Sequence, residues 1–540
     1  MPTLPMWSRG AALGLAAAAL LAQPAPAQRG DTIAAAFPPP ADRVPTLVVF
    51  ITVDQLRPDY FERFGRGMTG GLARLYRGGA VFTNAFHDHA NTETAPGHAS
   101  TLSGRFPAST GILRNADGVQ DPQAPLLGAR GPGASPFRFR GTTLVDWLRT
   151  KDPRSRALSV SRKDRGAILP IGRDPQEVYW YASNGTFTTS TWYADTLPAW
   201  VQRFNARRLP HAMAGREWTL LLDESAYPEP DSLEVGSAAG RALFPHVMSS
   251  SPDTAAALLP NYPWMDEVTL AFALEGLDAL RIGAGPQTDV LAVSLSAMDA
   301  VGHAFGPDSR EVHDHMLRLD RMVGAFLDSL YRLRDSSRVV VALTADHGVA
   351  PYPKVRQALG GPAPVYVDPR TANRELWDGF RARGVPEDAV AWVDGVLLVE
   401  RTLLARAGID ADSLVAAFIS WARALPGVAR VDRVRDLARA DTTTDAIARR
   451  WLHTLPAELP AEVVVTSAEY AVPLGSTYAQ HGSPWDYDAH VPVIFYGPPF
   501  RSGRYDAFAR VVDMAPTLAW VTGTRPLERL DGQVLRAALR

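Results

Sequence analysis

Runs of apolar residues alternate with amphipathic segments along most of this chain. Residues 45–54 read PTLVVFITVD, a nearly continuous apolar run that is typical of a strand buried on both faces of a parallel sheet. Similar strands are predicted at residues 156–161, 289–294, 339–344 and 491–496. Helical patterns occupy residues 69–77, 142–150, 266–280, 309–334 and 513–522. Because strand followed by helix is the recurring unit, the sequence predicts an α/β fold whose mostly parallel central sheet is flanked by helices.

Two long excursions interrupt this alternation. Residues from about 178 to 265 are rich in aromatic residues and proline and show little clean periodicity, so we interpret them as an insertion or cap. Residues from about 354 to 471 form a second excursion, with strand and helix patterns of their own. We find no internal repeat. The chain is therefore expected to be one catalytic domain, residues 28–540, with two inserted cap segments.

The first 27 residues have the features of a secretory signal peptide. Arg9 supplies a positive charge, residues 11–22 form an apolar run that is too short to span a bilayer comfortably, and Ala25-Pro26-Ala27 fits a cleavage site. The alternative is a buried or interfacial helix. We expect an exported protein, periplasmic or secreted, that has no membrane anchor once the signal is removed.

Composition narrows the chemistry. The 540 residues carry a net charge of −2, so there is no global basic field that would favour nucleic acid as a partner. The chain has no cysteine, which excludes disulfides, thiolate metal sites and a cysteine nucleophile. Any metal site must therefore use histidine, carboxylate or hydroxyl ligands.

A hydroxyl at the start of a helix is the first candidate for catalysis. The stretch around Thr94 reads TETAPGHASTLSG, and Pro96 suits the first turn of a helix. The amides of that turn favour negative charge near Thr94, so this side chain is placed to act as a nucleophile toward an anionic group. Asn115, 21 residues later, can donate to the same anion. Taken alone, Thr94 is more often a simple helix cap.

Acidic residues and histidines follow several predicted strands. Asp54, Asp299 with His303, and Asp346 with His347 come after three of the strands, and His481 lies in a fourth loop. Each of these residues alone has a plain structural explanation, such as a turn, a helix cap or a surface pair. Together they offer oxygen and nitrogen ligands that suit zinc. Six such ligands are too many for one tetrahedral zinc, and Thr94 makes seven, which suits two ions that share an in-line displacement.

Other histidines compete for the role of ligand. His87, His89, His313 and His315 are not preceded directly by a strand end, so we expect them to face solvent or to lie behind the ligands. His490 precedes Val491-Pro492 and is expected to be structural.

These motifs resemble the alkaline phosphatase superfamily. The resemblance rests on Asp54 after the first strand, Thr94-Ala-Pro-Gly-His98, Asp299-x-x-Gly-His303, Asp346-His347-Gly348, His481-Gly482 and Asp513-Met-Ala-Pro-Thr517. It covers most of the chain outside the two excursions. Within the superfamily, the sequence is most similar to the phosphate-irrepressible branch that uses a threonine nucleophile.

The resemblance implies a two-zinc site and a set of substrate-binding residues. One zinc would be held by Asp299, His303 and His481, and the other by Asp54, Asp346, His347 and Thr94. Asn115 would contact a phosphoryl oxygen. The Lys163-Asp164-Arg165 motif matches the monoesterase branch, in which Lys163 and Arg165 would bind the transferred phosphoryl group. The alternative for these two cations is a surface salt-bridge pair.

The implied activity is hydrolysis of phosphate monoesters through a phosphothreonine intermediate. Two cations beside the metals pair well with a dianionic monoester, whereas a diester carries one negative charge. The alternatives are a phosphodiesterase or nucleotide pyrophosphatase on the same scaffold and a non-enzymatic protein that retains the fold. A sulfatase fits less well because sulfatases use a modified Cys or Ser. The expected partners are small phosphate monoesters. The sequence does not reveal an oligomeric state, although we expect a monomer.

Overall fold

The computed structural model describes residues 44–230, 243–358, 360–474 and 479–540. The expected signal peptide, residues 1–27, lies outside these residues. Within the described part of the chain, no helix combines the length and the apolar character needed to cross a membrane.

A nine-stranded sheet forms the centre of the molecule. Its strand order is β18-β2-β17-β10-β1-β9-β4-β5-β6. The five strands from β10 to β5 are mutually parallel, whereas β17 and β6 pair antiparallel with their inner neighbours. The strand bounds are β1 (Leu47–Val53), β2 (Ala80–Phe82), β4 (Ala157–Ser161), β5 (Glu177–Ala182), β6 (Thr186–Thr188), β9 (Asp289–Leu295), β10 (Val339–Thr344), β17 (Val493–Tyr496) and β18 (Gly503–Tyr505). The prediction of a mostly parallel sheet is confirmed.

The register of the central strands aligns their carboxyl ends. Thr52 of β1 pairs with Ser294 of β9 on one side and with Thr344 of β10 on the other. Every residue of β1, β9 and β10 is buried, which explains their continuous apolar runs. The loops after all three strands therefore begin at the same edge of the sheet, where open α/β sheets bind their ligands.

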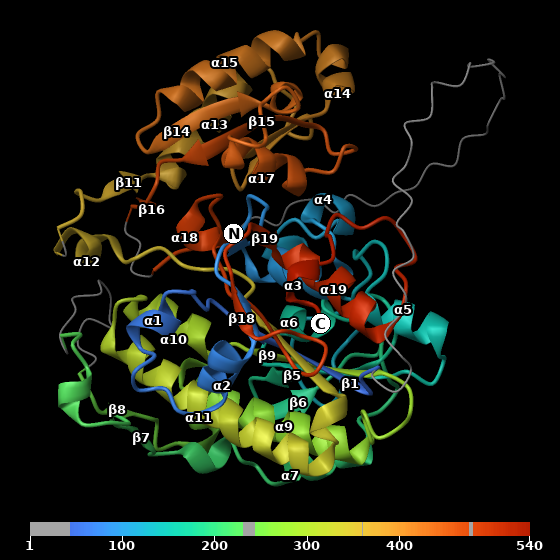
Figure 1. The fold of residues 1–540 in the computed structure, drawn as a ribbon. Coiled ribbons are helices and arrows are strands. Elements are labelled where there is room, and N and C mark those ends of the chain that lie inside the picture. The colour runs from blue at the N-terminus through green and yellow to red at the C-terminus, as the bar shows by residue number, and fades with distance from the viewer. Residues whose placement is uncertain (1–43, 231–242, 359, 475–478) are drawn as a thin grey trace, which may run out of the picture. The chain divides into compact units, whose positions relative to one another are not determined.

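Helices cover both faces of this sheet (Figure 1). One layer contains α2 (Gly71–Gly78), α9 (Trp264–Ala279) and α11 (Arg310–Leu333), and the other contains α3 (Thr94–Ser103), α5 (Leu144–Lys151) and α19 (Met514–Thr522). The long helix α11 begins where the Ser309 side chain accepts a hydrogen bond from the Val312 N–H. Its buried apolar positions recur every three or four residues, among them Val312, Met316, Leu319, Val323 and Leu327.

The two excursions differ in how they relate to the sheet. The first, at about 178–265, begins within β5, so its opening strands β5 and β6 extend the central sheet instead of forming a separate cap. The second, at about 354–471, contains its own sheet in the order β12-β13-β15-β14. Its main elements are β12 (Val390–Val393), β13 (Val396–Val399), β14 (Val428–Arg433), β15 (Ala461–Ser467), α13 (Pro369–Ala382), α15 (Ala411–Arg423) and α17 (Ala446–Thr454). Leu376, Phe380, Val415 and Phe418 belong to a hydrophobic core separate from that of the main sheet.

Candidate metal centre and active site

Three buried carboxylates meet at the carboxyl edge of the sheet. Asp54 directly follows β1, Asp346 follows β10, and Asp299 lies on α10 (Ala297–Phe305), which follows β9. Asp54 and Asp346 are completely buried, and Asp299 is 5% exposed. Because three carboxylates are costly to bury without counter-charge, this edge requires a cation nearby.

The nucleophile candidate lies beside them. Thr94 is the first residue of α3, and the ammonium nitrogen of Lys163 donates to its Oγ1 at 3.2 Å. The same nitrogen lies 2.5 Å from Oδ2 of Asp54 and 2.7 Å from Oδ2 of Asp299. Lys163 thus links Thr94 to two of the predicted metal ligands.

Gly97 allows α3 to approach the ligand loop closely. A Cβ atom at this position would lie 2.2 Å from the backbone oxygen of Asp346, far inside van der Waals contact. The Ala-Pro-Gly-His motif therefore has a packing reason: only glycine lets the first turn of α3 rest against Asp346.

One group of potential metal ligands brings together the three residues that were predicted for one of the two zinc ions. Asp299, His303 and His481 present ligand atoms that all lie within 4.8 Å of one another. Nε2 of His303 lies 3.2 Å from Oδ1 of Asp299 and 3.2 Å from Nε2 of His481. Asp299 and His303 are four residues apart on α10, so the helix itself brings them to one face.

The second group shares only Asp54 and His347 with the predicted set: it contains Asp299, and it includes neither Asp346 nor the Thr94 hydroxyl. The structure brings Asp54, His347 and Asp299 together within the same limit. Asp346 lies at the border of this group, with its Oδ2 at 3.6 Å from Nε2 of His347. Its Oδ1 accepts the backbone N–H of Gln55, and its Oδ2 lies 3.2 Å from Nδ1 of His98. Asp299 is thus shared by both groups, which places the two groups side by side.

The three histidines of the site share one hydrogen-bond pattern. Nδ1 of His303 donates to the Ala479 carbonyl oxygen at 2.6 Å, and Nδ1 of His481 donates to the carbonyl oxygen of Thr92 at 2.8 Å. Nδ1 of His347 donates to the carbonyl of its neighbour Gly348 at 2.9 Å. A carbonyl can only accept, so Nδ1 carries the proton and a neutral ring keeps its Nε2 lone pair for a metal ion.

Several buried polar atoms of the site lack a hydrogen-bond partner among the described residues. They are Oδ1 of Asp54 and Nε2 of His347. Oδ2 of Asp54 and Oδ2 of Asp346 also accept no well-directed hydrogen bond, although each has an ion-pair neighbour, Lys163 at 2.5 Å and His98 at 3.2 Å. Orphaned acceptors of this kind are rare in protein interiors. Their chemistry, all oxygen and nitrogen, fits a divalent cation such as zinc.

Burial and neighbouring charges set the pKa values of the site. Burial raises the pKa of Asp54, and the negative charges of Asp299 and Asp346 add to this effect. Burial also opposes ionisation of Asp299, but Lys163 and His303 outweigh it and hold the pKa of Asp299 well below its usual range. Burial and the charges of His347 and His303 lower the pKa of His481, which keeps its ring neutral, as a ligand must be.

The predicted phosphoryl-binding residues are placed unequally. Oδ1 of Asn115 accepts the N–H of Ala95 at 2.8 Å, and the Asn115 N–H donates to Oε2 of Glu93 at 2.6 Å. These bonds fix the side chain at the N-terminus of α3 and leave its NH₂ group without a described acceptor. Arg165 is further out: its side chain is 27% exposed, and its ion-pair partner in the structure is Asp164, at 3.6 Å.

Two residues that the sequence reasoning assigned no role support the ligands. Gln55 has a backbone φ of 67°, unusual for a residue with a side chain, and its Nε2 donates to Oδ1 of Asp299 at 3.1 Å. His98 is fully buried, between the Thr94 carbonyl oxygen at 2.9 Å and Oγ of Ser294 at 2.9 Å. The available signals were the position of Gln55 directly after Asp54 and the position of His98 one turn after Thr94.

The rival histidines are not exposed. His87, His89, His313 and His315 are at most 5% exposed, so of the two alternatives expected for them, exposure to solvent is wrong, and a place behind the ligands remains. None of them belongs to a candidate metal group in the described part of the chain. His87 instead donates to the carbonyl oxygen of Ala345, directly before Asp346. Nε2 of His490 bonds to the Thr83 carbonyl oxygen, as a structural residue would.

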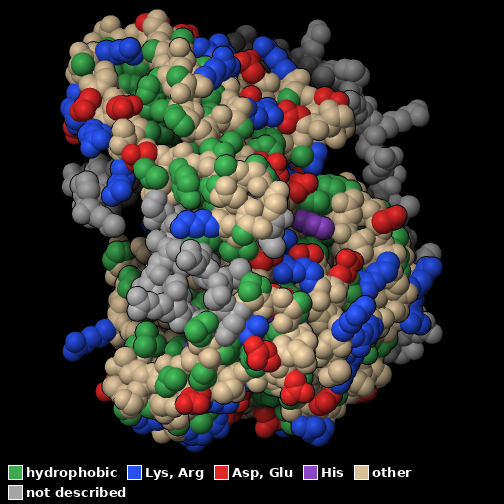
Figure 2. Space-filling view, turned by 90° about the vertical axis from the view of Figure 1, so that its left-hand side faces the viewer, with side chains coloured by type: hydrophobic (Ala, Val, Ile, Leu, Met, Phe, Trp, Pro, Cys, Tyr) green, Lys and Arg blue, Asp and Glu red, His purple; other side chains and the backbone are tan. Residues whose placement is uncertain are grey.

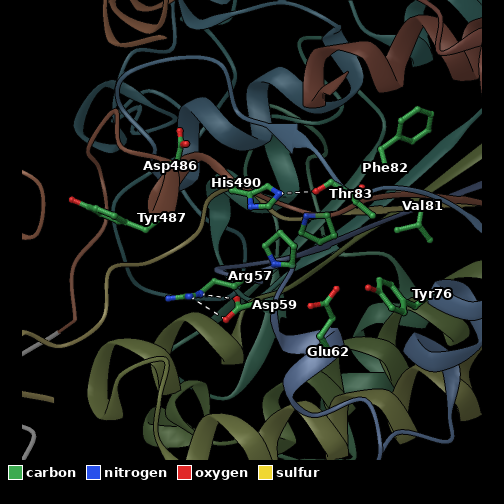
Figure 3. A pocket seen from close by; sticks show the side chains of 12 residues that line it. Arg57, Asp59, Glu62, Tyr76, Val81, Phe82, Thr83, Asp486, Tyr487 and His490 are labelled. Atoms are coloured by element: carbon green, nitrogen blue, oxygen red, sulfur yellow. Dashed lines mark hydrogen bonds and ion pairs between the residues drawn. The ribbon is translucent and has the colours of Figure 1, made fainter. Parts of the chain in front are cut away.

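The candidate metal centre reaches the protein surface. The side chain of His303 is 30% exposed, so the metal centre is accessible from outside. Figure 2 shows a histidine on one face of the molecule with acidic and basic side chains around it. A separate hollow of about 320 Å³, shown in Figure 3, is lined by Arg57, Tyr487 and His490 among others, and it contains none of the predicted site residues.

The sequence of this chain matches the model of a known protein family. Residues 48–360 match the model of the type I phosphodiesterase / nucleotide pyrophosphatase family, and this chain belongs to that family. The matched region contains every predicted site residue except His481.

Several relatives that match over nearly the whole chain are named alkaline phosphatases. The chain is 30% identical to alkaline phosphatase PhoK of Sphingomonas sp over 91% of each chain. It is 29% identical to alkaline phosphatase PhoV of Synechococcus elongatus over 88% of this chain and 89% of the relative. The crystal structure of alkaline phosphatase PafA superimposes with a TM-score of 0.84 at 26% identity, covering 92% of this chain and 99% of the other. The resemblance to the alkaline phosphatase superfamily is thereby confirmed.

Proposed function

We propose that this protein is an alkaline phosphatase, exported from the cell, that hydrolyses phosphate monoesters at a two-zinc site. The observation that carries the proposal is the position of the Lys163 ammonium group, 3.2 Å from the Thr94 hydroxyl and beside Asp54 and Asp299. A cation next to the nucleophile complements the second negative charge of a monoester. The alkaline phosphatases that match this chain from end to end support the same activity.

The metal ligands are assigned in two sets. Asp299, His303 and His481 would hold one zinc, and Asp54, Asp346, His347 and Thr94 would hold the other. Bound there, the two ions would lower the pKa of the Thr94 hydroxyl and neutralise the leaving oxygen. With zinc on Asp54 and Asp299, these carboxylates would compete less for the Lys163 ammonium group, which could then bind a phosphoryl oxygen.

The chain's own residues then carry the displacement. Oγ1 of Thr94 gives up its proton and attacks phosphorus, an O–P bond forms to Thr94, and the bond to the leaving oxygen breaks. The leaving oxygen takes up a proton and departs as the alcohol. Water later cleaves the phosphothreonine and regenerates the hydroxyl. Lys163, Arg165, the Asn115 amide and the first amides of α3 stabilise the charge on the non-bridging oxygens, and loss of one such donor commonly lowers the rate by about 10²–10³.

A phosphodiesterase or nucleotide pyrophosphatase is the second candidate, because the matched family carries that description. The two candidates are separated by the ratio of kcat/KM for 4-nitrophenyl phosphate to that for bis(4-nitrophenyl) phosphate on zinc-loaded protein. We expect a strong preference for the monoester. A preference for the diester would favour the phosphodiesterase or nucleotide pyrophosphatase activity. No activity on either ester would overturn the phosphatase proposal.

A further inference from the structure

A large cavity lies between the loop that leads into Thr94, which includes Asn91 and Glu93, and the second inserted segment. Its volume is about 710 Å³, enough for a small organic molecule. On one side it is lined by Glu93, the residue directly before Thr94, and by His481. On the other side it is lined by residues of the segment at 354–471, among them Glu375 on α13 and Trp392 on β12. One wall of the cavity therefore contains a candidate ligand of the zinc that would face the leaving oxygen.

The charges around this cavity have one sign. Four carboxylates line it, and no lysine or arginine does so in the described part of the chain. Asp394 is paired with Arg114 at 3.2 Å. The other three, Glu93, Asp368 and Glu375, form no ion pair with a described residue: Glu93 accepts the Asn115 N–H, and Asp368 accepts backbone N–H groups at the start of α13. Arg114 and Arg165 act on Glu93, and Arg370 acts on Asp368, but none of these arginines lines the cavity, so its lining carries an excess of negative charge.

Aromatic rings complete the lining. Trp392, Trp451 and Tyr366 all contribute to the wall. Trp392 is held edge-on against Phe418 and Trp421, and the Trp451 indole N–H donates to Oγ1 of Thr466 at 2.9 Å. These contacts fix the two indole rings in place. Fixed rings together with a lining whose carboxylates outnumber its cations make an environment that attracts an organic cation.

We propose that this cavity receives the leaving group of the substrate and favours phosphate monoesters of alcohols that carry an amine or a quaternary ammonium group. The assignment rests on the proposed phosphatase activity, which puts the leaving oxygen at the Asp299, His303 and His481 site. A positive leaving group gains from the carboxylates and the indole faces. A leaving group with extra negative charge is repelled by the same carboxylates.

The test compares choline phosphate with 3,3-dimethylbutyl phosphate, its uncharged isostere. The ratio of their kcat/KM values is measured at low ionic strength for the wild type and for Glu375→Gln and Glu375→Lys. Comparison within each protein cancels the different reactivities of the two alcohols. Because Glu375 is exposed and contacts no described residue through its carboxylate, both variants are expected to fold.

We expect the ratio to fall about threefold in Glu375→Gln and about tenfold in Glu375→Lys, since an exposed charge contributes modestly and its reversal adds repulsion. Asp378→Asn is the matched control, because Asp378 lies three residues along the same helix, is exposed and does not line the cavity. An equal ratio in the wild type and both Glu375 variants would overturn the leaving-group assignment. If the wild type did not hydrolyse 4-nitrophenyl phosphate, the phosphatase proposal would be overturned, and the leaving-group assignment with it.

Discussion

At the scale of single residues, Lys163 is the side chain that distinguishes the two candidate activities. It is almost fully buried, and its ammonium group reaches the nucleophile and two carboxylates at once. A lysine in such a place is not a surface charge. Its charge attracts any anion that approaches Thr94. Its contribution to transition-state stabilisation therefore depends on the number of negative charges on the ester.

We predict that Lys163→Ala lowers kcat/KM for a monoester by about 10²–10³, the effect of losing one preorganised charge donor, and lowers the diester rate less. Parallel kinetics on the two nitrophenyl esters check this. Thermal unfolding of the variant serves as a control for folding. Equal losses of kcat/KM on both esters would show that Lys163 does not select the dianionic monoester.

Gln55 acts on the metal ligands through both backbone and side chain. Its N–H donates to Asp346 and its amide to Asp299, so it orients one carboxylate of each predicted zinc set. We predict that Gln55→Gly, which accepts the positive φ, weakens zinc binding about 10- to 100-fold, as loss of an outer-shell partner usually does.

Gln55→Ala should lose the same affinity and be about 1 kcal/mol less stable than Gln55→Gly, because alanine, like the native glutamine, has a Cβ that is strained at φ 67°, whereas glycine does not. Zinc affinity measured against a competing chelator, together with unfolding midpoints, separates the two effects. Wild-type affinity in Gln55→Gly would contradict the positioning role.

At the scale of elements, the approach of α3 to the ligand loop is the tightest geometric requirement. We predict that Gly97→Ala lowers activity by at least about 10²-fold and destabilises the protein by about 1–3 kcal/mol, because the added methyl collides with the Asp346 backbone. Gly379→Ala is the matched control: it lies within α13 with open space around it, so alanine should be neutral or slightly stabilising. Equal behaviour of the two variants would show that the close contact is not required.

The helix α17 is anchored to the nucleophile loop by Asp88. Burial disfavours the charge of Asp88, but hydrogen bonds from His453 and Arg449 prevail and lower its pKa to about 2. The pKa of Asp88 is lower in the folded state than its unfolded value of about 3.8, so the ionised carboxylate stabilises the fold. This stabilisation is about 2 kcal/mol above pH 3.8, and it is lost as the pH falls from 3.8 toward 2.

We therefore predict that Asp88→Asn is less stable than the wild type at pH 7 and that about half of this difference has disappeared at pH 3. Chemical unfolding of the metal-free proteins at the two pH values measures it. A difference that stays constant with pH would show that Asp88 contributes through packing and not through its charge.

At the scale of the whole molecule, the metal centre joins segments that are far apart in the sequence. Ligands from the loops after β1, β9 and β10 and from the loop at His481 meet at one edge of the sheet. We predict that chelation lowers the unfolding temperature and that added zinc restores it, with a gain of about 2.7 kcal/mol at a free concentration one hundred times Kd.

Zinc binding should also release protons, because the raised pKa of Asp54 lets it hold a proton to a higher pH than an ordinary carboxyl group. The affinity is therefore expected to increase with pH. Calorimetry in two buffers of different ionisation enthalpy counts the protons released. An affinity independent of pH would contradict the charge state inferred for the site.

The sequence by itself determined the sheet and most of the candidate site. Apolar runs without alternation required strands buried on both faces, and parallel strands present their carboxyl ends at one edge, so Asp54, Asp299 and Asp346 had to approach one another. The four-residue spacing of Asp299 and His303 fixed their common face on a helix. These features are local or follow from strand direction, so the order of apolar and polar residues along the chain is enough to predict them.

Only the tertiary structure decided contacts between segments that no local pattern connects. The Lys163 bridge to Asp54 and Asp299, the use of the first excursion to extend the sheet, and the burial of His87 and His313 all depend on how distant elements pack. The acidic and aromatic cavity is of the same kind, because Glu93 and Glu375 lie 282 positions apart in the chain. Periodicity predicts which face of an element is buried, but it does not specify which other element covers that face, and that choice is made by packing.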